Sequence, residues 1–132
     1  MVKVHIYKDN KGNVVKYVLS GHARYSKLPK FFEYMARLFF IKEHAGYPEA
    51  GKDVVCAAVS SVAQAAVVGL KEVLGLHVGL EMEDGYLECV LPDDITEEEK
   101  GKAGIILETM VTALKNIEMQ YKNLLHVIET EV

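Results

Sequence analysis

The chain has few cysteines, no excess of basic residues and no long apolar run at its start. Its two cysteines, Cys56 and Cys89, fall in different predicted elements and do not form the closely spaced framework of a disulfide-stabilised protein. The first residues alternate between apolar and polar types, so they lack the apolar segment of a signal peptide. No apolar run approaches the roughly 20 residues that cross a bilayer. We therefore expect a reduced, cytoplasmic protein without a membrane partner.

The charge balance argues against nucleic acid as a direct partner. The 132 residues carry 15 basic and 19 acidic side chains, a net charge of −4. This balance provides no global basic field for DNA or RNA and suits a basic protein partner better. Half of the residues are hydrophobic, and the length fits a single domain, residues 1–132, with a substantial core.

The hydrophobic pattern predicts strands and helices in one layered domain. Alternation predicts strands near residues 2–8, 14–20, 78–82, 87–91 and 124–132, with Asp84-Gly85 as a hairpin turn. Apolar residues at helical spacing predict a helix over 54–74 that ends at Gly75. Thr96 and Glu99 form the capping box of a second long helix. We expect an α+β fold, a two-layer sandwich with a mixed, largely antiparallel sheet and two long helices on one face.

The sequence pattern predicts that residues 24–45 are an insertion that contains its own helix. Pro29 suits a first helical turn, and Phe31, Met35, Leu38 and Phe39 then recur at helical spacing. Basic residues outnumber acidic ones here, in contrast to the rest of the chain. The extra helix either covers the sheet or a dimer seam, or it forms a lid or docking surface beside an active site.

Cys56 is the residue with the clearest chemical potential. We expect it at the third position of its helix, with Asp53 as the N-cap, where free backbone N–H groups favour a thiolate. Position alone leaves open whether this thiol is reactive or structural. Ser60 lies one turn further on, and the small side chains there leave room for another chain to approach the sulfur. Cys89 falls on the apolar face of a strand, which is typical of an inert core thiol.

A nucleophilic thiol needs a histidine base within hydrogen-bond reach. His5, His77 and His126 fall on strands or strand edges where a surface role is expected. His22 and His44 are better placed, because both lie in loops that lead to the Cys56 helix. Four ligands at compact spacing are missing, so we expect no metal site and no cofactor.

Two segments resemble the ribosomal-processing cysteine protease Prp family. They are Ser20-Gly21-His22-Ala23 and Gly46-Tyr47-Pro48-Glu49-Ala50-Gly51-Lys52-Asp53-Val54-Val55-Cys56-Ala57-Ala58-Val59-Ser60. The order of strands and helices also resembles that family, over nearly the whole chain except roughly residues 24–45. The resemblance implies a cytosolic homodimeric peptidase that removes a short N-terminal extension from ribosomal large-subunit protein twenty-seven. Carried onto this sequence, it implies Cys56 as the nucleophile and His22, the histidine of the Gly-His-Ala segment, as the base. We also expect Gly21 and Ser60 in the substrate pocket.

The histidine is where this chain departs from the family pattern. The family joins its histidine to the cysteine by a short loop, whereas His22 lies far before Cys56 and His44 lies at the usual short spacing. Gly21 and the strand end favour His22 as the base, and His44 is the alternative. A non-catalytic protein of ribosome assembly on the same scaffold, or a fold with an unreactive thiol, would also carry these segments.

Overall fold

The computed structural model describes residues 1–21 and 50–132, and in the second range it describes side chains from Val54 onward. The elements follow the order β1 (Val2–Lys8), β2 (Val14–Gly21), α2 (Ala50–Val68), a π-helical turn η3 (Gly69–Val73), β3 (Gly79–Glu83), β4 (Tyr86–Val90), α3 (Glu97–Gln120) and β5 (Leu125–Glu131). The predicted extra helix within residues 24–45 lies outside the described residues.

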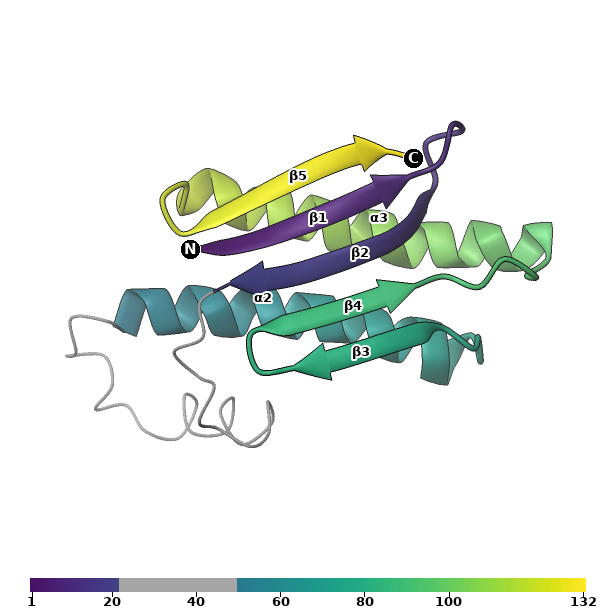
Figure 1. The fold of residues 1–132 in the computed structure, drawn as a ribbon, viewed down its shortest axis with the longest axis horizontal. Coiled ribbons are helices and arrows are strands. Elements are labelled where there is room, and N and C mark those ends of the chain that lie inside the picture. The colour runs from purple at the N-terminus through teal and green to yellow at the C-terminus, as the bar shows by residue number, and fades with distance from the viewer. Residues whose placement is uncertain (22–49) are drawn as a thin grey trace.

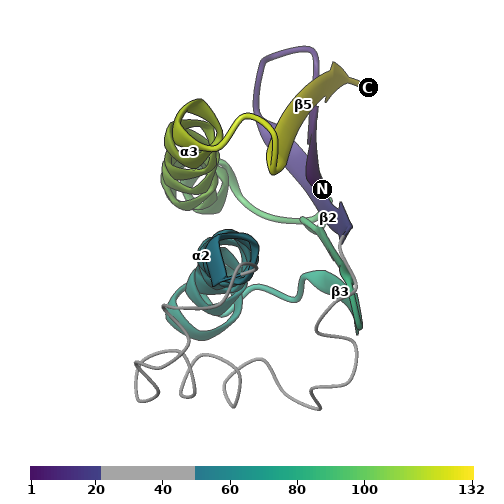
Figure 2. The ribbon, with the colours of Figure 1, turned by 90° about the vertical axis from the view of Figure 1, so that its left-hand side faces the viewer.

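The strands form one mixed sheet in the order β3-β4-β2-β1-β5 (Figure 1). β1 pairs antiparallel with β2 and parallel with β5, and β4 pairs antiparallel with both β2 and β3. The long helices α2 and α3 lie side by side on one face of this sheet (Figure 2). The predicted α+β two-layer architecture is therefore confirmed.

The first hairpin sets the register of the sheet. Val4 pairs with Leu19 and Ile6 with Tyr17, and all four side chains are buried beneath the helices. The turn is stabilised by Asp9, whose carboxylate accepts hydrogen bonds from the backbone N–H groups of Lys11 and Asn13, both at 2.9 Å. These bonds lower the pKa of Asp9 below its ordinary value.

α3 begins where the sequence predicts. The Thr96 hydroxyl accepts from the Glu99 N–H at 3.1 Å, and the Glu99 carboxylate accepts from the Thr96 N–H at 2.9 Å. This reciprocal pair is the predicted capping box. The buried face of the helix is made by Ala103, Leu107, Met110, Val111 and Leu114.

α2 begins earlier than the sequence predicts. The helix runs from Ala50, whereas we expected its first residue near Val54. Gly51 and the loop-like composition before it disfavour a helix, and the fold overrides that weak preference. The predicted C-terminal end is confirmed, because Gly75 takes the left-handed conformation (φ +68°) directly after the C-cap Leu74.

The same helix is unusually apolar. The stretch Val54–Val73 has a mean hydropathy of 1.7 over an 18-residue window, which by length and composition alone suffices to cross a membrane. The expectation that no run approaches this length was therefore wrong. Of that window, 44% is buried inside the domain, and Val59, Ala63 and Leu70 pack in its core. A core helix has the same composition, so this property says little about a membrane.

Tyr17 links α2 to the sheet through a buried hydrogen bond. Its ring is only 1% exposed, and its hydroxyl donates to the backbone carbonyl of Ala63 at 2.8 Å. Burial raises the pKa of Tyr17, so the hydroxyl remains a donor. This bond joins the middle strand of the sheet to the helix that carries Cys56.

We predict that Tyr17→Phe lowers the free energy of unfolding by about 1 kcal/mol, because one buried hydrogen bond is lost while the packing of the ring is kept. Urea denaturation followed by circular dichroism measures the change. Tyr86→Phe is the matched control, since the Tyr86 hydroxyl donates to the Glu88 carboxylate in a less buried bond on the sheet face away from the helices, and its loss should matter less. Equal effects of the two substitutions would contradict the prediction that the buried hydrogen bond from Tyr17 to Ala63 stabilises the fold.

Candidate active site

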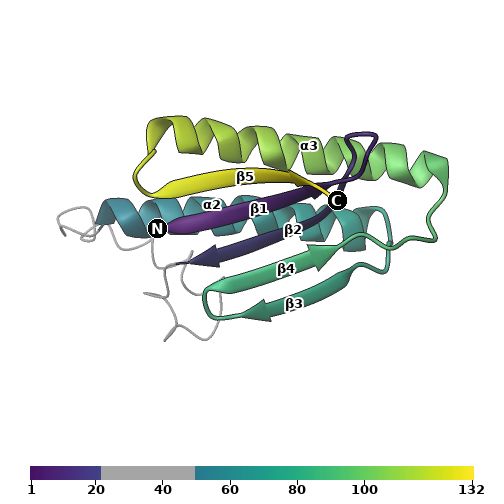
Figure 3. The same cartoon turned by 45° about the horizontal axis from the view of Figure 1, so that its top comes forward.

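Several chain segments meet at one end of the domain. β2 ends there, α2 begins there, and the β3–β4 turn and the connection from α3 to β5 lie at the same end (Figures 1 and 3). The N–H of Gly21 donates to the carbonyl of Gly85 at 3.1 Å, which ties the end of β2 to the β3–β4 turn. Loops between such fixed points are well suited to carry function.

Gly21 is required at the end of β2 by a close backbone contact. Its φ is +135°, a conformation that side-chain-bearing residues rarely adopt. A Cβ added there would lie 2.3 Å from the carbonyl oxygen of Met1 and 2.8 Å from the Cα of Val2. Gly21 is therefore held against the start of β1. The sequence placed Gly21 at the end of a strand, and this backbone approach was not predicted.

The helix start changes the surroundings expected for Cys56. Because α2 begins at Ala50, Asp53 lies within the first turn, and the prediction that it is the N-cap is wrong. Cys56 lies in the second turn, beyond the four residues whose N–H groups have no partner within the helix. The favourable effect of the helix end on a thiolate falls off after the first turn. Activation of this thiol therefore depends more on a base than we expected.

The Cys56 side chain lies in the apolar core near the start of α2. It is 9% exposed, and Val55 and Val59 beside it are almost fully buried. Ser60, one turn further along the helix, is half-buried. The two residues therefore share one side of α2, as their spacing predicts.

Cys89 provides a contrast within the same chain. It is 1% exposed on β4, carries a free thiol and is hydrogen-bonded to the Tyr17 side chain. Burial raises the pKa of Cys89 above its ordinary value, which keeps the thiol protonated. The prediction that Cys89 is a buried core thiol is confirmed.

The two candidate bases, His22 and His44, lie outside the described residues. Of the other three histidines, His5 stacks on Tyr7 with ring centroids 6.1 Å apart, on the sheet face away from α2. His77 is exposed before β3. The Nδ1 of His126 lies 3.9 Å from a carboxylate oxygen of Glu118. Within residues 1–21 and 50–132, no group of three His, Cys, Asp or Glu side chains is placed to hold a metal ion.

The sequence model of the cysteine protease Prp family matches residues 32–126, which is most of the chain. A relative in Bacillus subtilis, the ribosomal processing cysteine protease Prp, is 33% identical over 91 residues, covering 67% of this chain and 81% of its own. The chain belongs to the cysteine protease Prp family. The matched range contains Cys56 and His44, and it begins after His22.

Solved structures share the fold. The S. aureus ribosomal processing protease Prp, crystallised with a covalently linked product peptide, superposes with a TM-score of 0.69 at 20% identity, covering 98% of this chain and 100% of that one. A Streptococcus mutans protein superposes with a TM-score of 0.71 at 21% identity, covering 100% and 96%. The α+β architecture is therefore that of the Prp proteases.

We predict that Gly21→Ala lowers the free energy of unfolding by at least about 2 kcal/mol, because both the backbone conformation and the space at Met1 exclude a side chain. Gly12→Ala is the matched control: Gly12 also has a positive φ, +84°, but nothing lies within 4 Å of an added Cβ. Chemical denaturation compares the two variants. A smaller loss for Gly21→Ala than for Gly12→Ala would contradict the close approach at Met1.

Proposed function

We propose that this protein is a cysteine endopeptidase that removes an N-terminal extension from a ribosomal large-subunit precursor, with Cys56 as the nucleophile. The observation that carries the proposal is the family match, which spans the helix of Cys56 and nearly all of the domain beyond it. The position of Cys56 at the end of the domain where β2 stops and α2 starts supports it. Cys89 is a poor alternative, because it is almost inaccessible and its pKa is raised.

His44 is the base that we propose in preference to His22. The sequence analysis favoured His22 because Gly21 and the strand end precede it. Gly21, however, is required by its contact with Met1, whatever residue follows it. The family match includes His44 at the usual short spacing before Cys56 and leaves His22 outside. His22 remains the alternative base that the experiment below tests.

The chemistry follows from a thiol and an imidazole. The histidine takes the proton of the Cys56 Sγ, and the thiolate attacks the carbonyl carbon of the scissile peptide bond. The imidazolium then gives its proton to the leaving amine, which leaves the N-terminal part of the substrate on the sulfur as a thioester. Water, deprotonated by the same histidine, hydrolyses the thioester and restores the thiol.

The donors for the oxyanion come from the first turn of α2 in this proposal. The N–H groups of residues 50–52 have no partner within the helix, and they lie about one turn before Cys56. Backbone N–H groups in that position stabilise a developing negative charge. This replaces the expectation that Cys56 is the third residue of its helix.

The substrate class follows from the relatives and from charge. The B. subtilis relative is named a ribosomal processing protease, and the S. aureus protease has been crystallised with a substrate peptide. Ribosomal large-subunit protein twenty-seven, cut after a hydrophobic, aromatic-containing stretch, is the substrate that the family resemblance implies. The net charge of −4 suits a basic precursor of this kind.

We predict that Cys56→Ala lowers kcat/KM for a tagged precursor by at least about 10³-fold, and that His44→Ala lowers it by about 10²- to 10⁴-fold. Cys89→Ala is the matched thiol control, and His22→Ala is the matched histidine control; each should retain most of the activity. Cleavage is followed by gel mobility and mass spectrometry of both products.

The outcomes of that comparison distinguish the thiol mechanism, the choice of base and the non-catalytic alternative. Cleavage that survives Cys56→Ala would refute the thiol mechanism. Loss in His22→Ala with full activity in His44→Ala would transfer the base to His22. Binding of the precursor without cleavage by the wild-type protein would favour the alternative of a non-catalytic assembly protein.

A further inference from the structure

The side of α2 that faces away from the sheet is uncharged and is not buried by the described part of the chain. Val59 and Ala63 pack toward the sheet, so residues about half a turn away from them face outward. Five such residues follow one another at spacings of three and four and share one side of the helix: Val54, Ala58, Ser61, Ala65 and Val68. We call them the outer row of α2. Its two ends, Val54 and Val68, are 51% and 50% exposed.

An uncharged outer row is unusual for a helix on the surface of a domain, where the outward side normally carries charged or polar residues. α3 follows that rule at its start, where Lys102 pairs with Glu98 at 3.2 Å in solvent. In α2 no charged residue occurs after Val54, and the next one is Lys71 in η3. Only 44% of the most apolar window of this helix is buried. The described residues therefore leave apolar surface of α2 without cover.

We propose that residues 24–45 of this same chain pack on the outer row of α2 and cover it. This segment lies outside the described residues, and its sequence supplies the apolar side chains that such a contact needs. All four phenylalanines of the chain fall within it: Phe31, Phe32, Phe39 and Phe40. Between residues 31 and 41 only Glu33 and Arg37 are charged. Burial of these side chains on an uncharged surface removes apolar area of both partners from water.

The points at which the segment joins the described chain allow this contact. β2 ends at Gly21 and α2 begins at Ala50, at the same end of the domain (Figures 1 and 3). From Ala50 to Val68 the helix rises about 27 Å. The chain from Ile41 to Ala50 spans up to about 30 Å when it is extended. The apolar stretch of residues 31–41 therefore reaches every position of the outer row.

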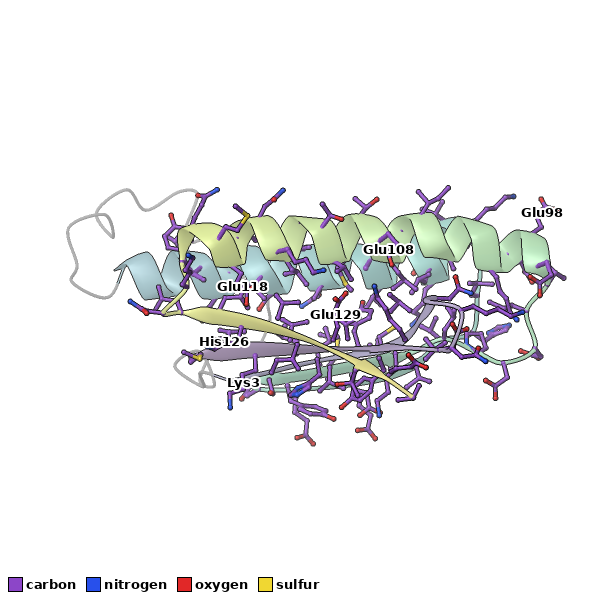
Figure 4. The ribbon with its side chains drawn as sticks, turned by 90° about the horizontal axis from the view of Figure 1, so that it is seen from above. Lys3, Glu98, Glu108, Glu118, His126 and Glu129 are labelled. Atoms are coloured by element: carbon purple, nitrogen blue, oxygen red, sulfur yellow. The ribbon has the colours of Figure 1, made fainter. Side chains whose placement is uncertain are left out.

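The open face of the sheet suits the segment less well. Its outward positions on β3 and β4 carry Glu81, Glu83 and Glu88, and those on β1 and β2 include Lys3 and Lys16. Figure 4 shows Lys3 on the side of the sheet away from α2 and α3. Phenylalanine side chains placed there would take these charges out of water without giving them partners, which is costly. The segment then covers the helical layer, and not the sheet as the sequence pattern allowed.

Thiol labelling of the full chain tests the proposal. Val68→Cys places a reporter on the outer row, and peptide mapping after reaction with iodoacetamide separates it from Cys56 and Cys89. Lys115→Cys is the matched control: it lies within α3, its side chain is 48% exposed, and it pairs with Glu129 of β5, away from α2. Each rate is divided by the rate of the same thiol in urea, which cancels intrinsic reactivity. We expect Val68→Cys to react at least about tenfold more slowly than Lys115→Cys on this scale.

A second substitution identifies the cover. Phe39→Asp, added to Val68→Cys, should raise the labelling rate at least about tenfold, because a carboxylate is not buried on an uncharged surface. Arg37→Asp is the matched control within the segment, since this position is already charged and lies off the apolar side predicted from the spacing. It should leave the rate at Val68→Cys unchanged. Neither substitution should alter the rate at Lys115→Cys.

Equal rates at Val68→Cys and Lys115→Cys would overturn the proposal, as would slow labelling that Phe39→Asp does not relieve. Slow labelling that becomes fast on dilution would show a second copy of the chain as the cover and would also overturn it. Circular dichroism reports whether each variant folds, and Ala65→Cys is the second reporter on the same row. This inference concerns packing alone and does not rest on the proposed function, so cleavage of a precursor, present or absent, does not decide it.

Discussion

The packing of α2 against the sheet is the interaction on which the rest of the structure depends. No charged residue occurs in α2 between Val54 and Val68, so the helix is stable in water only when one side of it is covered. Val59 and Ala63 are fully buried against the sheet, and the Tyr17 hydroxyl fixes the helix from the middle of its length. This packing places the start of α2, and with it Cys56, at the end of the domain where β2 finishes.

Most of the fold was predictable because its signals are local. The alternation in β1, the capping box at Thr96 and the left-handed Gly75 each follow from residues close in sequence, and the structure confirms all three. The start of α2 was not predictable in the same way. Asp53 is a good N-cap residue, but the helix extends before it to Ala50, past a glycine that disfavours helix formation.

Contacts between distant residues explain what the sequence could not predict about the site. Gly21 has to be a glycine because of the Met1 carbonyl, and the bond from Tyr17 to Ala63 joins elements far apart in the chain. The pattern already distinguished the two cysteines, with Cys56 near a helix start and Cys89 on the apolar face of a strand, and the fold adds their surroundings. Cys89 is 1% exposed on β4 and pairs with Tyr17 of the middle strand, whereas Cys56 lies near the beginning of α2.

Covalent capture of the nucleophile tests the central claim most directly. A peptide with the sequence that precedes the scissile bond, ending in a chloromethyl ketone, alkylates a thiol that is activated and accessible to substrate. Intact-mass measurement followed by peptide mapping is expected to find one added peptide per chain, on Cys56, with Cys89 unmodified. Modification of Cys89, or equal and slow modification of both thiols at the rate of the unfolded chain, would contradict the assignment of Cys56 as the nucleophile.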